Sequence, residues 1–304
     1  MTHKIREVYI VHHSHTDVGY TDLQEQVIYN QANNIRRAVE LIENGIKNNT
    51  TQKDLKWNCE TWYCVEQFFK MATEEEKEKF FDLVKKGNIG LSANYLNFND
   101  LADCKYLKEK IHTMQEICGE KGIQIKTAMI ADINGISMGQ RDALIENGVE
   151  FLYTNIHTHH GMYPLYQNQK PYFWENENGQ RLLVWNGEHY NLGNALGIVL
   201  NKNVDVAGLL ENLHTNLAAS IKEYEENGYP YDFYITSVSG VFSDNAPINP
   251  AIADTVALFN EKYGEEVTMH MVTLQELYDK IRDKVQDAPV YRGALNDWWG
   301  NGVG

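Results

Sequence analysis

The residues best suited to chemistry lie together near the amino terminus, in residues 11–21, which read Val-His-His-Ser-His-Thr-Asp-Val-Gly-Tyr-Thr. His13, His15 and Asp17 alternate there, and alternate side chains of an extended segment point to the same side. Imidazole nitrogen and carboxylate oxygen together suit zinc or a similar divalent ion. A surface loop that happens to be rich in histidine is the alternative. The apolar run directly before the cluster, residues 8–11, favours the metal site.

Strand-like apolar runs alternate with helical patterns along the rest of the chain. Residues 22–47 carry apolar side chains at helical spacing. Further strands are predicted at residues 54–59, 88–93, 127–131, 151–154, 182–185 and 233–238, and further helices after Thr61 and at 74–86, 107–118 and 137–147. This alternation predicts an α/β fold with a parallel sheet, either open or closed into a barrel. No repeat and no Pro/Gly linker interrupts it, which favours one domain.

Polar side chains recur at the points where predicted strands end. Parallel α/β folds place their sites at the carboxyl ends of strands. The side chains concerned are Asp132, His157, His159, His160, Glu188, His189, Tyr190 and Asp244. We therefore expect a polar pocket that is surrounded by aromatic side chains.

The composition limits the classes of partner. The chain has 304 residues, a hydrophobic fraction of 43% and a net charge of −15. A surface this acidic repels phosphate backbones and anionic lipid heads, so we expect neither nucleic acid nor a membrane as partner. The charge does not exclude a carbohydrate as ligand. No stretch approaches the roughly 20 apolar residues of a membrane helix. No signal peptide is visible, which predicts a cytoplasmic protein or an exporting segment outside this sequence.

The cysteines and the carboxyl-terminal residues bear on the organisation of the chain. The four cysteines form no CxxC pair and are predicted to be free thiols. Residues 298–304 read Trp-Trp-Gly-Asn-Gly-Val-Gly, which is a poor end for a domain. We therefore expect residues 1–304 to be one catalytic domain, truncated at its carboxyl terminus, on which the remainder of a longer chain packs.

Two motifs resemble those of a known family. Residues 13–20, His-Ser-His-Thr-Asp-Val-Gly-Tyr, resemble the His-Ser-His-Asn-Asp-Pro-Gly-Trp motif of glycoside hydrolase family 38, the retaining α-mannosidases. Residues 129–137, Met-Ile-Ala-Asp-Ile-Asn-Gly-Ile-Ser, are similar to the family's Trp-x-x-Asp-x-x-Gly pattern. The resemblance implies a seven-stranded β/α barrel in which parallel strands alternate with helices. It also implies zinc held by His15, Asp17 and Asp132, with Asp132 as the catalytic nucleophile.

The sequence departs from the family pattern at several positions. Tyr20 stands where the family has the tryptophan that lines the sugar site, and Met129 stands where the second motif has its tryptophan. The family's fourth zinc ligand, a histidine well beyond the barrel sheet, has no matching position. Within this chain the substitutes are His159, His160 and His189, and a residue beyond Gly304 is the other possibility.

A retaining glycosidase needs a second carboxyl group about 5 Å from its nucleophile, to act as acid and base. Asp244 falls roughly where the family carries that acid, although a turn or helix cap also explains an aspartate before Pro247. Glu188 is the substitute candidate.

Four further residues are candidate substrate ligands. Tyr20 and Trp298 suit stacking on the apolar face of a sugar. Glu60 and His159 suit hydrogen bonds to sugar hydroxyls. A carboxylate at a helix amino terminus explains Glu60 equally well, and an exposed polar loop is the simpler interpretation of His159.

Taken together, the residues and the resemblance indicate a zinc-dependent, retaining, α-mannosidase-like glycoside hydrolase that forms a covalent glycosyl-enzyme on Asp132. One alternative is a metal-dependent carbohydrate deacetylase, in which metal-bound water attacks an acetamide. Another is a metal-bearing carbohydrate-binding scaffold that is inactive without further carboxyl-terminal parts.

Overall fold

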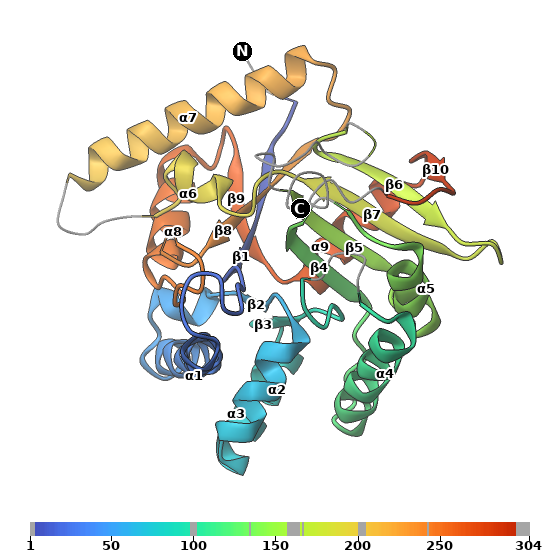
Figure 1. Cartoon of the computed structure of the whole chain (residues 1–304). Helices are drawn as coiled ribbons and strands as arrows, with labels where there is room; N and C mark the ends of the chain where they lie inside the picture. The colour runs from blue at the N-terminus through green and yellow to red at the C-terminus, as the bar shows by residue number, and fades with distance from the viewer. Residues whose placement is uncertain are drawn as a thin grey trace.

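A computed structural model describes residues 4–97, 102–133, 135–156, 165, 167–199, 205–241 and 243–295. The strands of these residues form two hydrogen-bonded sheets with helices packed outside them (Figure 1). Sheet A contains β1 (Glu7–His13), β2 (Trp57–Cys59), β3 (Ile89–Leu91), β8 (Phe233–Ser239) and β9 (Thr268–Val272). Sheet B contains β4 (Thr127–Asp132), β5 (Phe151–Ile156), β6 (Lys170–Glu175), β7 (Arg181–Gly187) and β10 (Val290–Tyr291).

The strands of sheet A are all parallel, and β1 lies at its centre. β8 pairs with the whole of β1, from Glu7 opposite Phe233 to His13 opposite Ser239. On its other side β1 pairs first with β9 and then, at His13, with Asn58 of β2. The carboxyl ends of β1, β2 and β8 therefore meet at one edge of the sheet, where His13 ends its strand.

Sheet B is mixed. Its order is β10-β6-β7-β5-β4, and β4, β5 and β7 are parallel, whereas β6 runs antiparallel to β7. The predicted α/β class with parallel strands is confirmed. The expected closed barrel of seven strands is not shown, because the ladders between described residues leave two separate sheets. The antiparallel strand β6 begins at Lys170 and was not predicted.

Helices cover both sheets from outside (Figure 1). They are α1 (Gln24–Asn48), α2 (Trp62–Met71), α3 (Glu74–Lys85), α4 (Cys104–Glu120), α5 (Met138–Glu146), α6 (Leu192–Leu196), α7 (Val206–Glu226), α8 (Ala251–Tyr263) and α9 (Leu274–Ile281), with short 3-10 turns at Thr51–Asp54 and Arg282–Lys284. Thr61 takes the predicted position before α2, but its hydroxyl contacts Cys64 Sγ at 3.1 Å and caps no backbone N–H.

Side chains and single backbone bonds join the free edges of β3 and β4, so the two sheets meet without a ladder. Ala93 N donates to the carbonyl of Thr127 at 2.9 Å. Ser92 Oγ accepts from Met129 N at 2.9 Å and donates to Met129 O at 3.4 Å. We call this contact between β3 and β4 the seam. It gives the molecule a barrel-like closure on this side.

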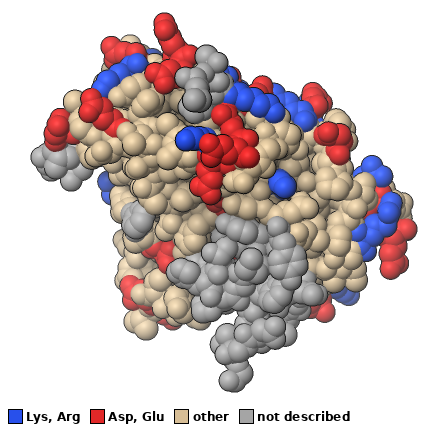
Figure 2. Space-filling view, turned by 90° about the horizontal axis from the view of Figure 1, so that it is seen from above, with Lys and Arg blue, Asp and Glu red and all other residues tan. Residues whose placement is uncertain are grey.

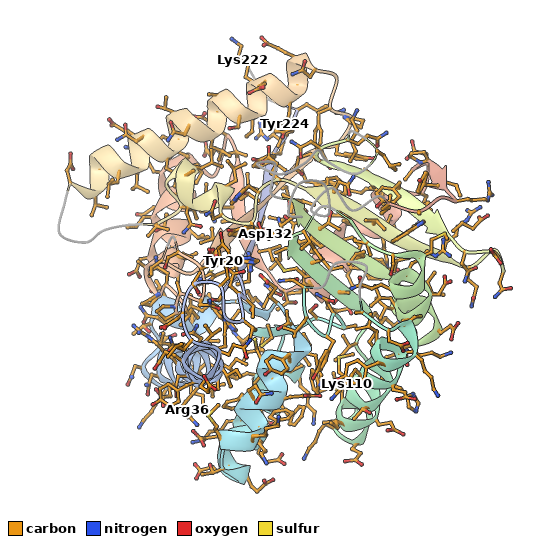
Figure 3. The ribbon with its side chains drawn as sticks, in the orientation of Figure 1. Tyr20, Arg36, Lys110, Asp132, Lys222 and Tyr224 are labelled. Carbon is orange, nitrogen blue, oxygen red and sulfur yellow. The ribbon has the colours of Figure 1, made fainter. Side chains whose placement is uncertain are left out.

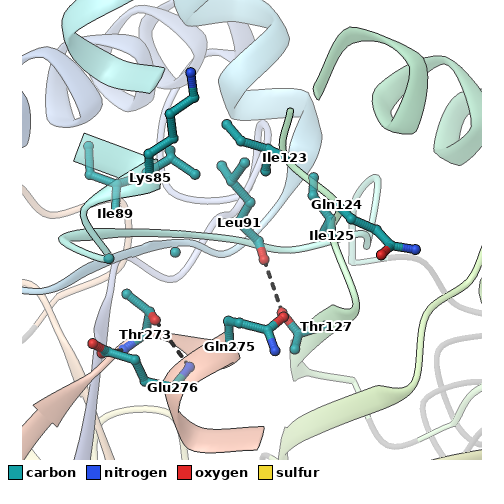
Figure 4. Close-up of a pocket in the computed structure, with 13 residues that line it drawn as sticks. Lys85, Ile89, Leu91, Ile123, Gln124, Ile125, Thr127, Thr273, Gln275 and Glu276 are labelled. Carbon is teal, nitrogen blue, oxygen red and sulfur yellow. Dashed lines mark hydrogen bonds between the residues drawn. The ribbon is translucent and has the colours of Figure 1, made fainter. Parts of the chain in front are cut away.

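The seam opens toward the amino ends of its strands. There a cavity of about 220 Å³ lies between the two edges and the start of α9 (Figure 4). Apolar side chains of Ile89, Leu91, Ile123 and Ile125 line it, together with Thr127 and Thr273. The cavity lies at the end of the strands opposite to the one that carries the predicted site residues.

The parallel strands β4, β5 and β7 of sheet B are buried on both faces, as parallel strands covered by helices usually are. On β4, Ala128 and Ile130 belong to one hydrophobic cluster and Met129 to the other. On β5, Leu152 belongs to the first cluster, and Phe151 and Tyr153 belong to the second. The same strands therefore contribute to both parts of the core.

The described residues show where the charged side chains and the cysteines lie. Seen from above, acidic and basic side chains are interspersed over the described face (Figure 2). Among the described residues, no helix has the combined length and apolar character that crossing a bilayer requires. All four cysteines are free: Cys59, Cys64 and Cys118 are buried, and Cys104 is exposed.

Candidate active site

Three predicted residues come together at the carboxyl ends of two strands. His15 and Asp17 follow β1, and Asp132 is the last residue of β4. One ligand atom from each of the three lies within 4.8 Å of the others. Figure 3 shows Asp132 near the centre of the molecule, where β4 ends. The sheets thus bring Asp132 close to His15 and Asp17, which precede it by 115 positions or more in the sequence.

Nε2 of His15, which faces Asp17 and Asp132, has the features of a metal ligand. His15 is 1% exposed, and its Nε2 is buried without a hydrogen-bond partner. Asp17 Oδ1 lies 3.4 Å from this nitrogen and Asp132 Oδ2 lies 3.8 Å from it. A buried polar atom without a partner is costly. One imidazole nitrogen and two carboxylates therefore fit a divalent cation such as zinc.

Asp132 itself has an unusual backbone. Its φ is +75°, a region that residues other than glycine rarely adopt. Ile133 N donates to the carbonyl of Ala131 at 3.0 Å, so Asp132 is the central residue of a three-residue γ-turn. Strained conformations of this kind concentrate at functional sites. The turn directs the carboxylate away from the strand and toward His15.

Glu60, which follows β2, orients His15 from behind. Its side chain is fully buried, and its Oε1 lies 3.1 Å from His15 Nδ1. The same oxygen accepts from Thr16 N at 3.1 Å and from Asn97 Nδ2 at 2.6 Å. Because Nδ1 donates to Glu60, Nε2 is left to face Asp17. A carboxylate that orients a histidine in this way is typical of metal sites.

His13 occupies the other oxygen of Glu60. Its Nδ1 lies 2.6 Å from Glu60 Oε2, and its Nε2 donates to the carbonyl of Tyr190 at 3.1 Å. Burial alone would raise the pKa of Glu60, but the charges and hydrogen bonds of His15 and His13 outweigh it and hold that pKa well below its usual range. His13 thus supports Glu60 and is not part of the candidate metal group. These contacts favour an orienting role for Glu60 over contact with a sugar.

Tyr190 connects His15 to the predicted acid. Its ring stacks on the His15 ring with centroids 4.1 Å apart. Its hydroxyl donates to Asp244 Oδ1 at 3.1 Å. Burial raises the pKa of Asp244 above its ordinary value. A raised pKa is what a carboxyl group needs to donate a proton near neutral pH.

The carboxylates influence one another across the site. The pKa of Asp132 is raised from 3.8 to about 6, and burial is the largest cause. The charges of Asp17, Asp244 and Glu60 contribute to this rise, whereas the charge of His15 opposes it. Asp132 and Asp244 therefore belong to one electrostatic group. Such an accumulation of acidic groups attracts a cation.

Asn245 joins the loops that carry these acids. Its N donates to the carbonyl of His15 at 2.8 Å, and its Nδ2 donates to the carbonyl of Asp17 at 2.9 Å. Its Oδ1 accepts from Asp17 N at 3.2 Å. The loop after β8, including Asp244, is thereby fixed against the loop after β1.

The other predicted site residues differ in their placement. Tyr20 lies on the loop after β1 and is 88% exposed, which leaves its ring open to a ligand (Figure 3). His159 and Trp298 lie outside the described residues. Glu188, the substitute acid, is buried, and its carboxylate accepts hydrogen bonds from Tyr224 and Tyr234. Its oxygens are thus directed away from the candidate metal group.

Sequence reasoning missed the supporting residues. Tyr190 was noted only as a polar residue after a strand, and the roles of Asn97 and Asn245 had no signal in the sequence. His189, a substitute fourth ligand, packs on Tyr190 with ring centroids 4.2 Å apart and is not in the group of His15, Asp17 and Asp132. The fourth ligand stays unassigned.

The family resemblance was tested by comparison with known proteins. The sequence model described as "Glycosyl hydrolases family 38 N-terminal domain" matches residues 6–294. The chain belongs to glycoside hydrolase family 38. It is therefore a domain of a glycosidase family that includes α-mannosidases, and the predicted resemblance is confirmed. A search of curated proteins gives no match.

Solved structures share the fold of this family 38 domain. An α-mannosidase from Enterococcus faecalis V583 is 15% identical, with a TM-score of 0.70 over 95% of this chain and 31% of that one. A family 38 protein from Enterococcus faecalis is 12% identical, with a TM-score of 0.67 over 96% and 29% of the two chains. A 4-α-glucanotransferase from Thermococcus litoralis is 14% identical, with a TM-score of 0.56 over 98% and 43%. The chain spans less than a third of the length of the two family 38 structures.

Proposed function

We propose that this family 38 domain is the catalytic domain of a metal-dependent, retaining, α-mannosidase-like glycoside hydrolase. The observation that carries the proposal is the group formed by His15, Asp17 and Asp132, in which Nε2 of His15 has no hydrogen-bond partner. Family membership supports the glycosidase class. The metal, the covalent step and the sugar belong to the proposal. So do the binding of carbohydrate and the packing of a longer chain on this domain.

We assign the two catalytic carboxyl groups to Asp132 and Asp244. In a retaining reaction one carboxylate attacks the anomeric carbon, and a second carboxyl group protonates the leaving oxygen and then takes a proton from water. Asp132 is the nucleophile in this proposal, because its γ-turn directs it into the group. Asp244 is the acid and base, and Tyr190 orients it through the hydrogen bond to Oδ1.

The proposed metal ligands are His15, Asp17 and Asp132. The chemistry that zinc supplies in such a site is a fixed positive charge that orients sugar hydroxyls and favours the ionised form of a neighbouring carboxylate. Glu60 keeps a proton on Nδ1 of His15, so the proton that a metal would displace is the one on Nε2. Tyr20 is proposed to stack on the sugar, because its ring is exposed beside this loop.

The first test is the metal content of the purified protein, wild type beside His15→Ala. We expect about one zinc ion per chain in the wild type and loss of it in the variant. His112→Ala is the matched control, because His112 is exposed on α4 and pairs with Glu116, which is exposed as well. A wild-type protein without metal, or a His15→Ala variant that retains it, would contradict the proposal.

Turnover of aryl α-mannosides then separates an enzyme from a binding scaffold. The protein should be assayed both as this chain and with the further length that the family 38 structures have. Hydrolysis with retained anomeric configuration supports the proposed mechanism. Glycan binding without turnover in both forms would favour the scaffold, and acetate release without glycosidic cleavage would favour the deacetylase.

A further inference from the structure

The candidate metal ligands come from two sheets between which the described residues form no ladder. His15 and Asp17 follow β1 of sheet A, whereas Asp132 ends β4 of sheet B. Their distances therefore depend on how the two sheets are held together at the seam. A shift of one sheet against the other would separate Asp132 from the other two residues.

Asn97 contacts one residue beside His15 and one beside Asp132, and thus both sheets that carry the candidate ligands. Its Nδ2 donates to Glu60 Oε1 at 2.6 Å, and Glu60 in turn orients His15. Its Oδ1 accepts from Ala131 N at 3.3 Å, directly before Asp132. One side chain thus links the residue behind the histidine to the strand end that carries the aspartate.

A second amide supports Asn97. Asn94 Nδ2 donates to the same Oδ1 at 3.2 Å, and Asn94 Oδ1 accepts from Gln140 Nε2 of α5 at 3.2 Å. The Asn97 amide therefore has partners for both its oxygen and its nitrogen. Its oxygen accepts two hydrogen bonds and so has no lone pair left for a metal, and we infer that its role is to hold other residues in place.

We propose that Asn97 is a positioning residue that couples the two halves of the metal-binding group across the seam. The inference rests on the proposed function, because it concerns the same site. Asn97 holds Glu60 against His15 Nδ1, and it holds the end of β4 so that the turn at Asp132 stays directed at His15. Residues that support metal ligands in this way typically change metal affinity 10- to 100-fold when they are replaced.

The test compares Asn97→Ala with a control at the same seam. Thr127→Val removes the hydrogen bond from Thr127 Oγ1 to the carbonyl of Leu91, 3.3 Å long, and leaves Glu60 and Ala131 untouched. Asn97→Ala and Thr127→Val each remove hydrogen bonding at the seam, but only Asn97 contacts Glu60 and Ala131, which adjoin the candidate ligands. Asn97→Ser is the second variant, because serine is polar but too short to reach both partners.

Two readouts are required, and neither is enzymatic activity. Zinc affinity is measured by competition with a chelator, and hydrogen exchange of the Ala131 amide is measured in the metal-free protein. We expect Asn97→Ala and Asn97→Ser to bind zinc about 10- to 100-fold more weakly and to exchange the Ala131 amide faster. Thr127→Val should bind zinc as the wild type does.

The outcomes distinguish this inference from the proposed function. If the wild type binds no zinc, the proposed function fails and the coupling role of Asn97 fails with it. If the wild type binds zinc and the Asn97 variants bind it equally well, only the inference is overturned. Faster exchange at Ala131 with unchanged zinc affinity would also overturn it, because the bond would then hold the strand without affecting the ligands. Weaker binding in Thr127→Val, equal to that in Asn97→Ala, would show a general effect of the seam and overturn the specific role.

Discussion

Asp132 is destabilising in two ways in the metal-free protein. Its positive φ is unfavourable for a residue with a side chain. Its carboxylate is partly buried and lies near Asp17 and Asp244, both of which contribute to the raised pKa. Clustered carboxylates of this kind are typical of a cation site. They repel one another in the metal-free protein, and a bound cation compensates for that repulsion.

We therefore expect Asp132→Asn to stabilise the metal-free protein at pH 7.5. The pKa of Asp132 rises from 3.8 to about 6 on folding, so its ionised form opposes folding by about 1–3 kcal/mol above pH 6. This penalty decreases as the pH falls through 6 and is absent below the unfolded pKa. The advantage of the variant should thus disappear near pH 4, as measured by urea unfolding with a chelator present.

The same substitution should act oppositely when zinc is added. Because Asp132 is a proposed ligand and nucleophile, Asp132→Asn should gain less stability from zinc than the wild type and should lose turnover by several orders of magnitude. Asp82→Asn, at an exposed position of α3, is the control and should change neither property. A wild type that is more stable than Asp132→Asn without metal at pH 7.5 would contradict the electrostatic argument.

At the scale of elements, α6 packs so closely on β8 that only glycine fits between them. A Cβ at Gly193 would lie 2.7 Å from the carbonyl oxygen of Ser237 and 2.7 Å from Val238 Cγ2. Asn194, the next residue, donates to Ser239 O and accepts from Ser239 N, which fixes α6 along the free edge of β8. The close approach of α6 therefore provides hydrogen-bond partners for the edge of β8 that pairs with no strand among the described residues.

Gly193→Ala should destabilise the protein by about 1–3 kcal/mol, because the new methyl group meets backbone that cannot move aside freely. Gly119→Ala is the matched control. A Cβ at Gly119 meets nothing within 4 Å, and the residue lies within α4. There alanine should stabilise by about 0.5–1 kcal/mol through helix propensity. Thermal unfolding of both variants measures the difference, and equal midpoints would show that α6 shifts without cost.

At the scale of the whole molecule, both hydrophobic clusters share strands β4, β5 and β7. Leu182 and Val184 of β7 belong to the first cluster, whereas Leu183 and Trp185 belong to the second. If one cluster unfolds, its strands also expose the residues of the other cluster, which lie on their opposite face. We therefore predict one cooperative unfolding transition for the chain, as for a single domain.

Coincident transitions in far-ultraviolet and near-ultraviolet circular dichroism would support this prediction. Two separated transitions would mean that the clusters unfold independently, and the expectation of one domain over residues 1–304 would then fail. Trp185, at 0% exposure, belongs to the second cluster, and Trp57, at 2%, belongs to the first. Fluorescence of single-tryptophan variants can therefore follow the two clusters separately.

The sequence by itself determined the family and the class of the fold. His13, His15 and Asp17 were predicted as ligands from a local pattern, because metal ligands need particular atoms at a strand end, whereas Asp132 was predicted from the family resemblance. The strands around them were predictable because buried parallel strands are continuous apolar runs. The expected strand at residues 127–131 is β4, which ends one residue later at Asp132.

Only the tertiary structure decided how the sheets close and what supports the ligands. The sequence predicts Glu60 either as a sugar ligand or as a carboxylate at a helix amino terminus, and only the fold shows that His13 and His15 reach it from another strand. Asn97 and Tyr190 acquire their roles from partners distant in the sequence, and an asparagine or tyrosine after a strand carries no local sign of that. Strand ladders follow local periodicity, whereas the seam depends on which side chains meet when two sheets are packed together.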